Sequence, residues 1–393
     1  MTEIFLIIFF ISVLLFFLGS GIWVAISMIG VSTIGMMLFT SRPVGDAMAT
    51  TIWGTSSSWT LTALPLFVWM GEILFRTKLS ENLFAGLSPW MQKLPGGLIH
   101  VNVVGCALFA AISGSSAATV ATVGKMSIPE LRKRKYPEKI LLGSLAGSGT
   151  LGLLIPPSII LIIYGVTVQE SIAKLFIAGI IPGIMIALIF MSYVMIWSLI
   201  NKKSMPKYVE NFSFLEKIRK SKQLLPVIIL ISAVIGSIYT GVATATEAAS
   251  LGVVGALILS YFQKSLTIET FKQSLLGATK TSCMIAFILA GSTFLSLAMG
   301  FTGLPRNLAI WIQNMELSPY VLIFVLMIFY IILGMFLDGI SAVVLTMAII
   351  EPMIRQAGFD MIWFGIFLVI VVEMAQITPP VGFNLFVLQG MAN

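Results

Sequence analysis

The chain has 393 residues, of which 58% are hydrophobic and 10% are charged. A soluble domain has about 25% charged residues, and no soluble core could bury this much apolar surface, so the composition excludes a soluble protein. The long apolar stretches suit helices across a hydrocarbon layer of roughly 30 Å, whereas a barrel would show short alternating segments. We therefore predict an all-α polytopic membrane protein. The net charge of +7 fits the Lys and Arg bias of cytoplasmic loops, and no nucleic-acid partner is expected.

Apolar segments predict membrane helices along the whole chain. They lie at about 4–19, 22–40, 51–75, 97–128, 138–168, 172–200, 224–241, 245–262, 282–300, 319–350 and 361–391. The first has no basic residue before it and no small-x-small cleavage site, which favours a retained helix over a removed signal. Two further stretches, 79–95 and 302–317, mix polar residues with Trp and Leu at helical spacing. They are typical of interfacial amphipathic arms.

Four of these segments are interrupted near their middle. Segments 97–128 and 319–350 break at SGSS and LDGIS, where Gly and Ser favour a turn, so we predict that each forms a re-entrant helical hairpin. Segments 138–168 and 361–391 break at IPP and TPP, because proline breaks a helix. Such irregular backbone is tolerated inside a membrane only where protein or a cavity surrounds it.

The basic loops predict the orientation. The loop 132–139 and the linker 201–223 are rich in Lys and Arg, so both must face the cytoplasm. Counting crossings outward from them leaves these basic residues outside: Arg42, Lys174, Arg306 and Arg355. This asymmetry would be lost if either hairpin were a full crossing. The N-terminus is then periplasmic or extracellular.

The basic cytoplasmic linker 201–223 separates two similar halves, 1–200 and 224–393. Each half contains a hairpin and then a proline-broken helix, with about 40 residues from the turn to the proline pair. The first half makes an odd number of crossings before the second half begins, so the two repeats are inverted. Inverted repeats with broken helices are the signature of secondary transporters, whose site lies near the midplane.

The breaks carry the polar groups of the predicted site. Backbone carbonyls and hydroxyls are hard ligands that suit Na⁺, and half-helix N-termini attract carboxylates. The polar side chains available at the breaks are Ser113, Ser115, Ser116, Thr150 and Ser158 in the first half and Asp338, Ser341, Thr378 and Asn384 in the second. The alternative is structural, because a proline pair can simply kink a helix and Ser can bond its own backbone.

A few single residues need separate interpretation. Asp338 is an acid deep in an apolar run, which makes it a functional candidate or the cap of a hairpin turn. Glu373 could bond the opened backbone or tune a cation site. His100 stands alone, and Cys106 and Cys283 both lie in apolar runs, so we expect Na⁺ as the only metal, with no transition-metal site and no disulfide.

Four motifs resemble the large membrane subunit of TRAP (tripartite ATP-independent periplasmic) transporters, a DctM-like family. They read AAISGSSAATVATVGKMSIPELRKRKYPEKILLGSLAGSGTLGLLIPPSIILIIYG, GVATATEAASLGV, GMFLDGISAVVLTMAIIEP and QITPPVGFNLFVLQG. The resemblance covers nearly the whole chain. It implies sodium-coupled uptake of organic acids, of the C4-dicarboxylate or sialic acid type, across a bacterial inner membrane. It also implies two partners, a small four-helix membrane subunit and a soluble periplasmic substrate-binding protein, and an elevator motion of hairpins and broken helices past a scaffold.

The resemblance also implies site residues. One cation site would comprise Ser113, Ser115, Ser116, Gly147, Gly149 and Thr150, and the other Asp338, Gly339, Ser341, Thr378 and Pro379. The substrate is expected between the hairpin tips, near Ser113, Ser158 and Asp338. The family's second half ends with a further helix that matches 176–200, and we expect the second repeat here, which stops at Asn393, to lack it.

Two other functions fit parts of the pattern. A stand-alone sodium–carboxylate symporter of similar inverted-repeat build would need no binding protein. An intramembrane protease would need a hydrogen bond between Ser116 as the nucleophile and His100 as the base. The resemblance favours a transporter over an enzyme.

Overall fold

The computed structural model describes residues 3–77, 79–206, 212–305, 307, 310, 318–379 and 382–392. Over these residues every regular element is an α-helix or a 3-10 helix. The first half contains α1 (Glu3–Gly19), α2 (Val24–Phe39), α3 (Val44–Ser56), η1 (Trp59–Thr62), α4 (Ala63–Phe75), α5 (Leu79–Met91), α6 (Ile99–Ser113), α7 (Ser116–Lys133), α8 (Glu138–Gly149), α9 (Leu151–Leu154), α10 (Ile159–Thr167) and α11 (Ile172–Ile200). The remainder contains η2 (Lys202–Ser204), α12 (Phe214–Ser221), α13 (Leu225–Tyr239), α14 (Ala245–Phe262), α15 (Ile268–Thr302), α17 (Pro319–Gly334), α18 (Gly339–Gln356), α19 (Met361–Gln376) and α20 (Phe383–Ala392).

Several helices have the length and composition of membrane spans. Among the described residues, α11, α14, α15 and α18 qualify alone, and up to 7 spans result if each bent helix pair counts as one. The surface agrees with this assignment, because α11 exposes Ile181 by 78%, Leu188 by 57% and Ile200 by 76%. Such a continuous apolar surface is not tolerated in water and suits contact with lipid.

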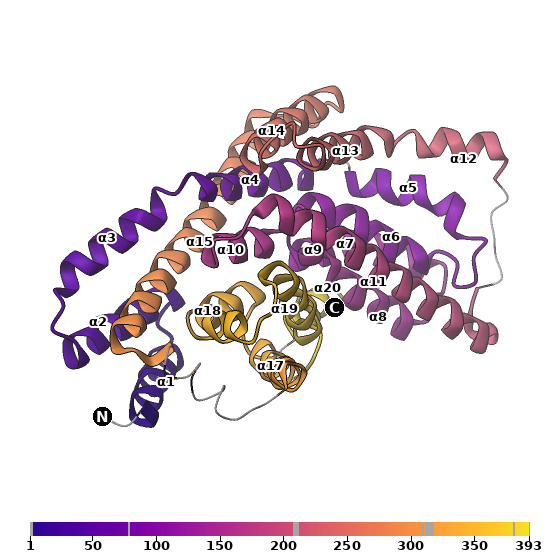
Figure 1. Cartoon of the computed structure of the whole chain (residues 1–393). Helices are drawn as coiled ribbons and strands as arrows, with labels where there is room; N and C mark the ends of the chain where they lie inside the picture. The colour runs from indigo at the N-terminus through magenta and orange to yellow at the C-terminus, as the bar shows by residue number, and fades with distance from the viewer. Residues whose placement is uncertain are drawn as a thin grey trace.

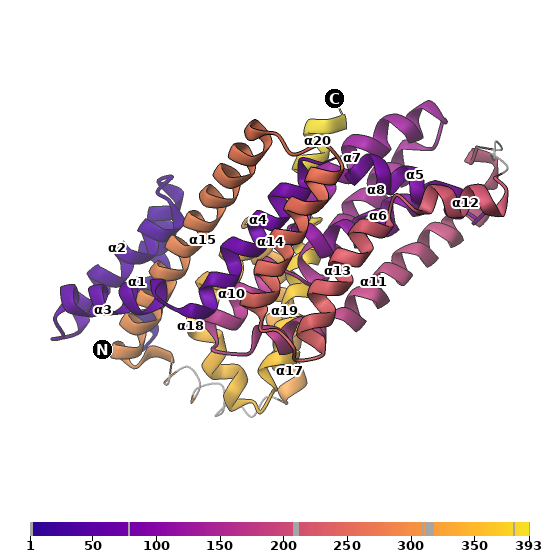
Figure 2. The same cartoon turned by 90° about the horizontal axis from the view of Figure 1, so that it is seen from above.

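The two hairpins and the two broken helices form a central body. The hairpins are α6 with α7 and α17 with α18, and the broken helices are α8–α10 and α19–α20. α10 packs against α18 and α19, and α20 packs against α7 and α8, so the two halves of the chain interlock. Figure 1 shows α1–α3 and α15 on one side of this body and α5 and α12 on the other. In Figure 2, α4, α13 and α14 run side by side and α15 continues along α4.

Two helical regions differ from the sequence-based segments. The segment predicted at 51–75 is a bent pair, because α3 starts at Val44 and a 52° bend separates it from η1 and α4 at Ser57 and Ser58. Hydroxyl side chains there bond nearby backbone carbonyls and compete with helix continuation; Ser57 Oγ donates to the Trp53 carbonyl at 2.8 Å. The segment predicted at 282–300 is only the apolar end of the 35-residue helix α15. Most of the predicted arm at 302–317 lies outside the described residues.

Candidate functional site

The turn of the first hairpin is built on glycine and serine. Gly114 ends α6 with φ +58°, in the left-handed region that favours glycine. Its carbonyl accepts the Ile159 N–H at 3.3 Å, so the hairpin tip is tied directly to the first broken helix. Ser115 is the N-cap of α7, where its hydroxyl accepts the Ala118 N–H at 3.4 Å. The tip therefore meets the helix break.

Hydroxyl and carbonyl oxygens cluster at this tip. Ser113 Oγ and Thr119 Oγ1 share a hydrogen bond of 2.8 Å, and Thr119 Oγ1 donates to the Ser115 carbonyl at 2.8 Å. Each oxygen keeps lone pairs that these bonds do not use. The cluster thus offers several hard oxygen ligands within one turn of chain. Thr119 was missed from the sequence, although it lies one helical turn after Ser115 and so faces the same way.

The first broken helix stops at Ile155 and restarts after the cis Pro156-Pro157 pair. Ser158 caps α10, because its hydroxyl accepts the Leu161 N–H at 3.3 Å and donates to the Leu153 carbonyl across the break. Thr150 Oγ1 donates to the Gly147 carbonyl at 2.6 Å. Ser158 therefore stabilises the break itself, whereas the Thr150 bond lies where α8 meets α9. Bonding nearby backbone is the structural role considered above, and the remaining lone pairs of the two hydroxyls are what they offer a ligand.

The glycines of this segment face different neighbours. A Cβ on Gly149 would lie 2.0 Å from Val120 Cγ2, and one on Gly152 would lie 2.6 Å from the Ser115 carbonyl oxygen. Both glycines therefore let the broken helix approach the hairpin. A Cβ on Gly147 would instead face Phe190 of α11 at 3.2 Å, away from the hairpin tip. Gly152, which was not singled out from the sequence, makes the closest backbone approach to the tip.

The second hairpin turns at Met335–Asp338. Asp338 is the N-cap of α18, and its Oδ2 accepts the Ser341 N–H at 3.1 Å, which leaves the other carboxylate oxygen for a different partner. Ser341 is buried. Gly339 lies against α19, where a Cβ would be 2.5 Å from Gln376 Nε2.

The second broken helix is interrupted after Gln376, where α19 ends. Thr378 Oγ1 donates to the Met374 carbonyl at 2.7 Å, and Pro379 is exposed. Asn384, just beyond the break, is 0% exposed and neither polar atom of its amide has a hydrogen-bond partner within the described ranges. A buried amide without partners is costly, so Asn384 is a strong candidate for ligand contact.

Gln376 joins the two halves. Ser116 Oγ of the first hairpin donates to Gln376 Oε1 at 2.7 Å, and Gln376 Nε2 lies against Gly339 of the second hairpin. One side chain of the second broken helix therefore touches both hairpin tips. The sequence signal for it was weak: Gln376 is a polar residue in an apolar helix, two residues before TPP.

Glu373 is the buried acid of this region. It is 4% exposed, and neither carboxylate oxygen has a hydrogen-bond partner among the described residues. Its carboxylate lies near the Leu153 backbone without meeting hydrogen-bonding geometry. The opened backbone of the first broken helix and this acid are therefore neighbours across the two halves.

The geometry does not support a protease. His100 Nε2 is hydrogen-bonded to the Pro95 carbonyl at 2.7 Å, near the start of α6, whereas the Ser116 hydroxyl bonds Gln376 at the hairpin tip. The required Ser–His pair is not formed. Over the described part of the chain, no group of three or more His, Cys, Asp or Glu side chains is arranged to hold a metal ion.

Comparisons with known proteins agree with this architecture. The family described as "Tripartite ATP-independent periplasmic transporter, DctM component" matches residues 10–393. The chain is 33% identical over 353 residues to the C4-dicarboxylate TRAP transporter large permease protein DctM of Pseudomonas aeruginosa, which covers 90% of this chain and 82% of that protein. It is 30% identical over 373 residues to the sialic acid TRAP transporter large permease protein SiaM of Vibrio cholerae, and the match covers 94% of this chain and 86% of that protein.

A solved structure is similar as well. The Alcanivorax borkumensis YdaH transporter superimposes on this chain with a TM-score of 0.65 and is 12% identical to it. The match covers 96% of this chain and 90% of the YdaH chain. At that identity the likeness concerns the fold alone. Because the family match spans almost the whole chain and relatives above 30% identity share most of their length with it, the chain belongs to the DctM family, the large permease component of TRAP transporters, and is a multi-pass transport protein and not an enzyme.

Proposed function

We propose that the chain is the sodium-coupled permease of a TRAP system that takes up an organic acid. The observation that carries this proposal is the meeting of the first hairpin tip with both broken helices, through the Ile159–Gly114 and Ser116–Gln376 hydrogen bonds. Gln376 also lies against Gly339 of the second hairpin tip. This arrangement concentrates hydroxyls and opened backbone in one region, which is what a dehydrated Na⁺ needs from its ligands.

Two cation sites follow from the two halves. In the first, Ser113, Ser115 and Ser116 supply hydroxyl or carbonyl oxygens, together with Thr150 and the backbone of Gly147 and Gly149. In the second, Ser341, Thr378 and the backbone around Gly339 and Pro379 take the same part. The matched spacing supports this assignment, because 115 to 156 and 338 to 379 are both 41 residues from the hairpin N-cap to the first proline.

The substrate site is proposed between the two tips, near Ser113, Ser158 and Asp338. A bare contact between Asp338 and a substrate carboxylate would be repulsive by roughly 4 kcal/mol at 4 Å and an effective dielectric near 20. Asp338 therefore contacts hydroxyl or amide groups of the substrate, with a nearby Na⁺ offsetting its charge. Relatives named for C4-dicarboxylate and sialic acid make these the first substrates to screen.

The two halves act as inverted repeats of an elevator. The central body of hairpins and broken helices moves as a unit together with α11, which packs against it, and the helices around it, including α13 and α14, form the scaffold. The basic linker at 201–223 stays on the cytoplasmic side, and the N-terminus on the periplasmic side of a bacterial inner membrane. A small four-helix subunit completes the scaffold, and a periplasmic binding protein delivers the substrate.

Reconstituted uptake tests the proposal. Proteoliposomes containing this chain with its small subunit should accumulate the organic acid only when the binding protein is outside and a Na⁺ gradient points inward. Undiminished uptake with K⁺ in place of Na⁺ and an imposed proton gradient would refute sodium coupling. Equal uptake without the binding protein would favour the stand-alone symporter instead.

A further inference from the structure

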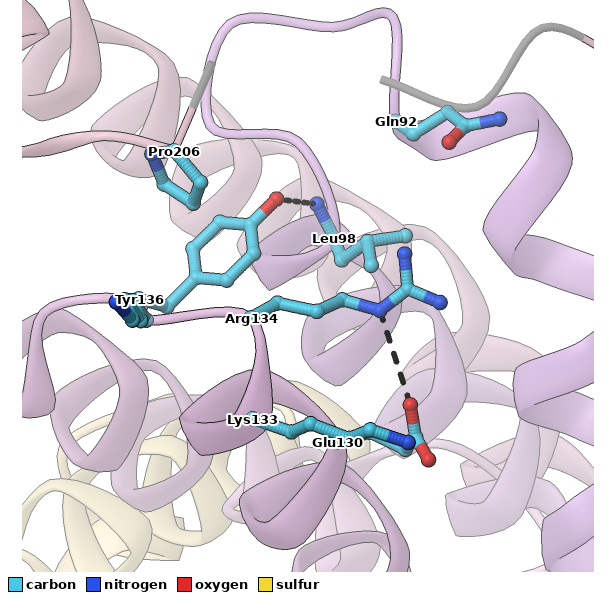
Figure 3. Close-up of a pocket in the computed structure, with 8 residues that line it drawn as sticks. Gln92, Leu98, Glu130, Lys133, Arg134, Tyr136 and Pro206 are labelled. Atoms are coloured by element: carbon cyan, nitrogen blue, oxygen red, sulfur yellow. Dashed lines mark hydrogen bonds and ion pairs between the residues drawn. The ribbon is translucent and has the colours of Figure 1, made fainter. Parts of the chain in front are cut away.

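A cavity of about 400 Å³ lies at the open end of the first hairpin, where α6 begins and α7 ends, far from the hairpin tip. Three segments meet around it: the turn between α5 and α6, the end of α7 with the loop that follows, and the chain just after η2. Its wall contains Gln92, Leu98, Glu130, Lys133, Arg134, Lys135, Tyr136 and Pro206. Figure 3 shows Arg134 and Tyr136 extending across the cavity from the α7 side toward the α5–α6 turn.

The wall is positively charged. Three consecutive basic residues, Lys133 to Lys135, line it together with one acidic residue, Glu130. That carboxylate is already engaged by Arg134, whose Nε lies 3.7 Å from Glu130 Oε2 (Figure 3). An anion that enters the cavity therefore meets excess positive charge with an apolar floor from Leu98.

Tyr136 adds a directed donor. Its hydroxyl oxygen accepts the Leu98 N–H at 3.0 Å, which fixes the ring while the phenol's own proton stays available to an anion. Burial raises the pKa of Tyr136, against the smaller opposing effects of the Leu98 hydrogen bond and the Arg134 charge. The group therefore remains a neutral donor at physiological pH.

The cavity adjoins the apolar surface of the protein. The Tyr136 ring packs against a small buried cluster that includes Val194 of α11, and Trp197 of α11 packs against the same cluster. The neighbouring side chains of α11 are exposed, with Ile196 at 58% and Ile200 at 76%. A molecule with a charged head and apolar tails could therefore place its head in the cavity and its tails along α11.

We propose that this cavity binds the phosphate of an anionic phospholipid headgroup, with the acyl chains lying along the outer face of α11. Lys133 and Lys135 neutralise the phosphate and Tyr136 donates a hydrogen bond to it. Basic pockets beside membrane helices on the cytoplasmic side are suited to such headgroups. The bound lipid connects the end of α7 to the turn after α5. Free phosphate has the same chemistry, and the continuity with α11 is what favours the lipid.

The test uses the full-length chain purified in neutral detergent. Native mass spectrometry counts bound lipid as phosphatidylglycerol or phosphatidylcholine is titrated, and thermal unfolding is followed in parallel. The test variant is Lys133→Gln with Lys135→Gln. Its matched control is Lys125→Gln with Lys139→Gln, which removes the same charge from exposed positions of α7 and α8 that do not line the cavity. Tyr136→Phe removes the hydroxyl, which is both the donor and the acceptor of the Leu98 N–H, without changing charge. A third arm adds inorganic phosphate alone.

We expect one phosphatidylglycerol to bind in preference to phosphatidylcholine and to raise the unfolding temperature. The test pair should bind it about 30-fold more weakly, Tyr136→Phe roughly 10-fold more weakly, and the control pair within about threefold of wild type. Equal losses in the two lysine pairs would mean diffuse surface attraction and would overturn the proposal. So would the absence of phosphatidylglycerol preference, or a cavity-dependent response to inorganic phosphate that the lipid does not displace.

Discussion

Replacing Gly152 by alanine should separate the first broken helix from the first hairpin. The new Cβ would lie 2.6 Å from the Ser115 carbonyl oxygen and 2.7 Å from both the Ser115 carbonyl carbon and the Ser116 Cα. All three atoms are backbone, so no rotamer change relieves the overlap. Normal contact needs about 3.5 Å, which requires a shift of roughly 1 Å between α9 and the hairpin tip. Such overpacking costs about 1–3 kcal/mol.

This cost arises at the contact between α9 and the hairpin tip, which is part of the proposed ion site. Uptake by Gly152→Ala should decrease at least about fivefold, since each 1.4 kcal/mol is a factor of ten in an equilibrium constant, and its unfolding temperature should fall by a few degrees. Both are measured on the reconstituted chain. Gly143→Ala is the control, because it lies in α8 of the same broken helix with nothing within 4 Å of its new Cβ and should be neutral or stabilising by up to about 1 kcal/mol. Normal uptake and stability in Gly152→Ala would refute the close-approach argument.

The remaining predictions concern one capping acid, one interhelical hydrogen bond and one exposed helix. Asp338→Asn keeps the acceptor for the Ser341 N–H and so should fold normally, while the sodium concentration for half-maximal uptake rises; unchanged sodium dependence would reduce Asp338 to a cap. Ser116→Ala leaves Gln376 Oε1 without its donor and should cost about 1–3 kcal/mol of stability, and adding Gln376→Leu should recover part of that loss in a double-mutant cycle; strictly additive losses would show that the bond contributes nothing. The Ser213 backbone N–H bonds the Glu216 carboxylate at 2.8 Å and holds the pKa of Glu216 below its usual value, so α12 should keep its cap above the ordinary glutamate pKa and lose it as the pH falls through the lower, folded pKa. Backbone chemical shifts of α12 between pH 7 and pH 3 would measure that loss, and chemical shifts that do not change with pH would contradict it.

Local chemistry predicted the breaks, and long-range packing determined their partners. Gly114 and the Pro156-Pro157 pair signal a turn and a helix break from sequence alone, because each limits what its own backbone can do. The pairing of Ser116 with Gln376 spans 260 residues, and no local pattern encodes it. Glycine roles were also ambiguous: Gly147 and Gly152 look equivalent in GSGTLGLL, yet they face Phe190 and the Ser115 backbone respectively. What a missing Cβ permits depends on the helix opposite.

The hydroxyls show the same limit. Ser158 and Thr150 were expected from their residue type as ion or substrate ligands, and in the fold both also bond backbone carbonyls, Ser158 that of Leu153 across the break and Thr150 that of Gly147 where α8 meets α9. The sequence allowed both roles and could not decide between them, because the bonds that form depend on where the chain bends. Asn384 is the contrasting case, since its amide is buried without a partner in the described part of the fold.

Helix α15 is longer than the layer it crosses. Its 35 residues extend about 52 Å at 1.5 Å per residue, against a hydrocarbon thickness of roughly 30 Å. Its charged residues, Glu269, Lys272 and Lys280, all lie in the first part, and the uncharged part at 281–302 is about 33 Å long. The beginning of α15 therefore projects out of the bilayer beside the end of α4, where Arg76 Nη1 donates to Gln273 Oε1 at 3.0 Å. A detergent micelle would not cover this projecting helical end. The end would therefore give single-particle images of the protein a fixed landmark for alignment.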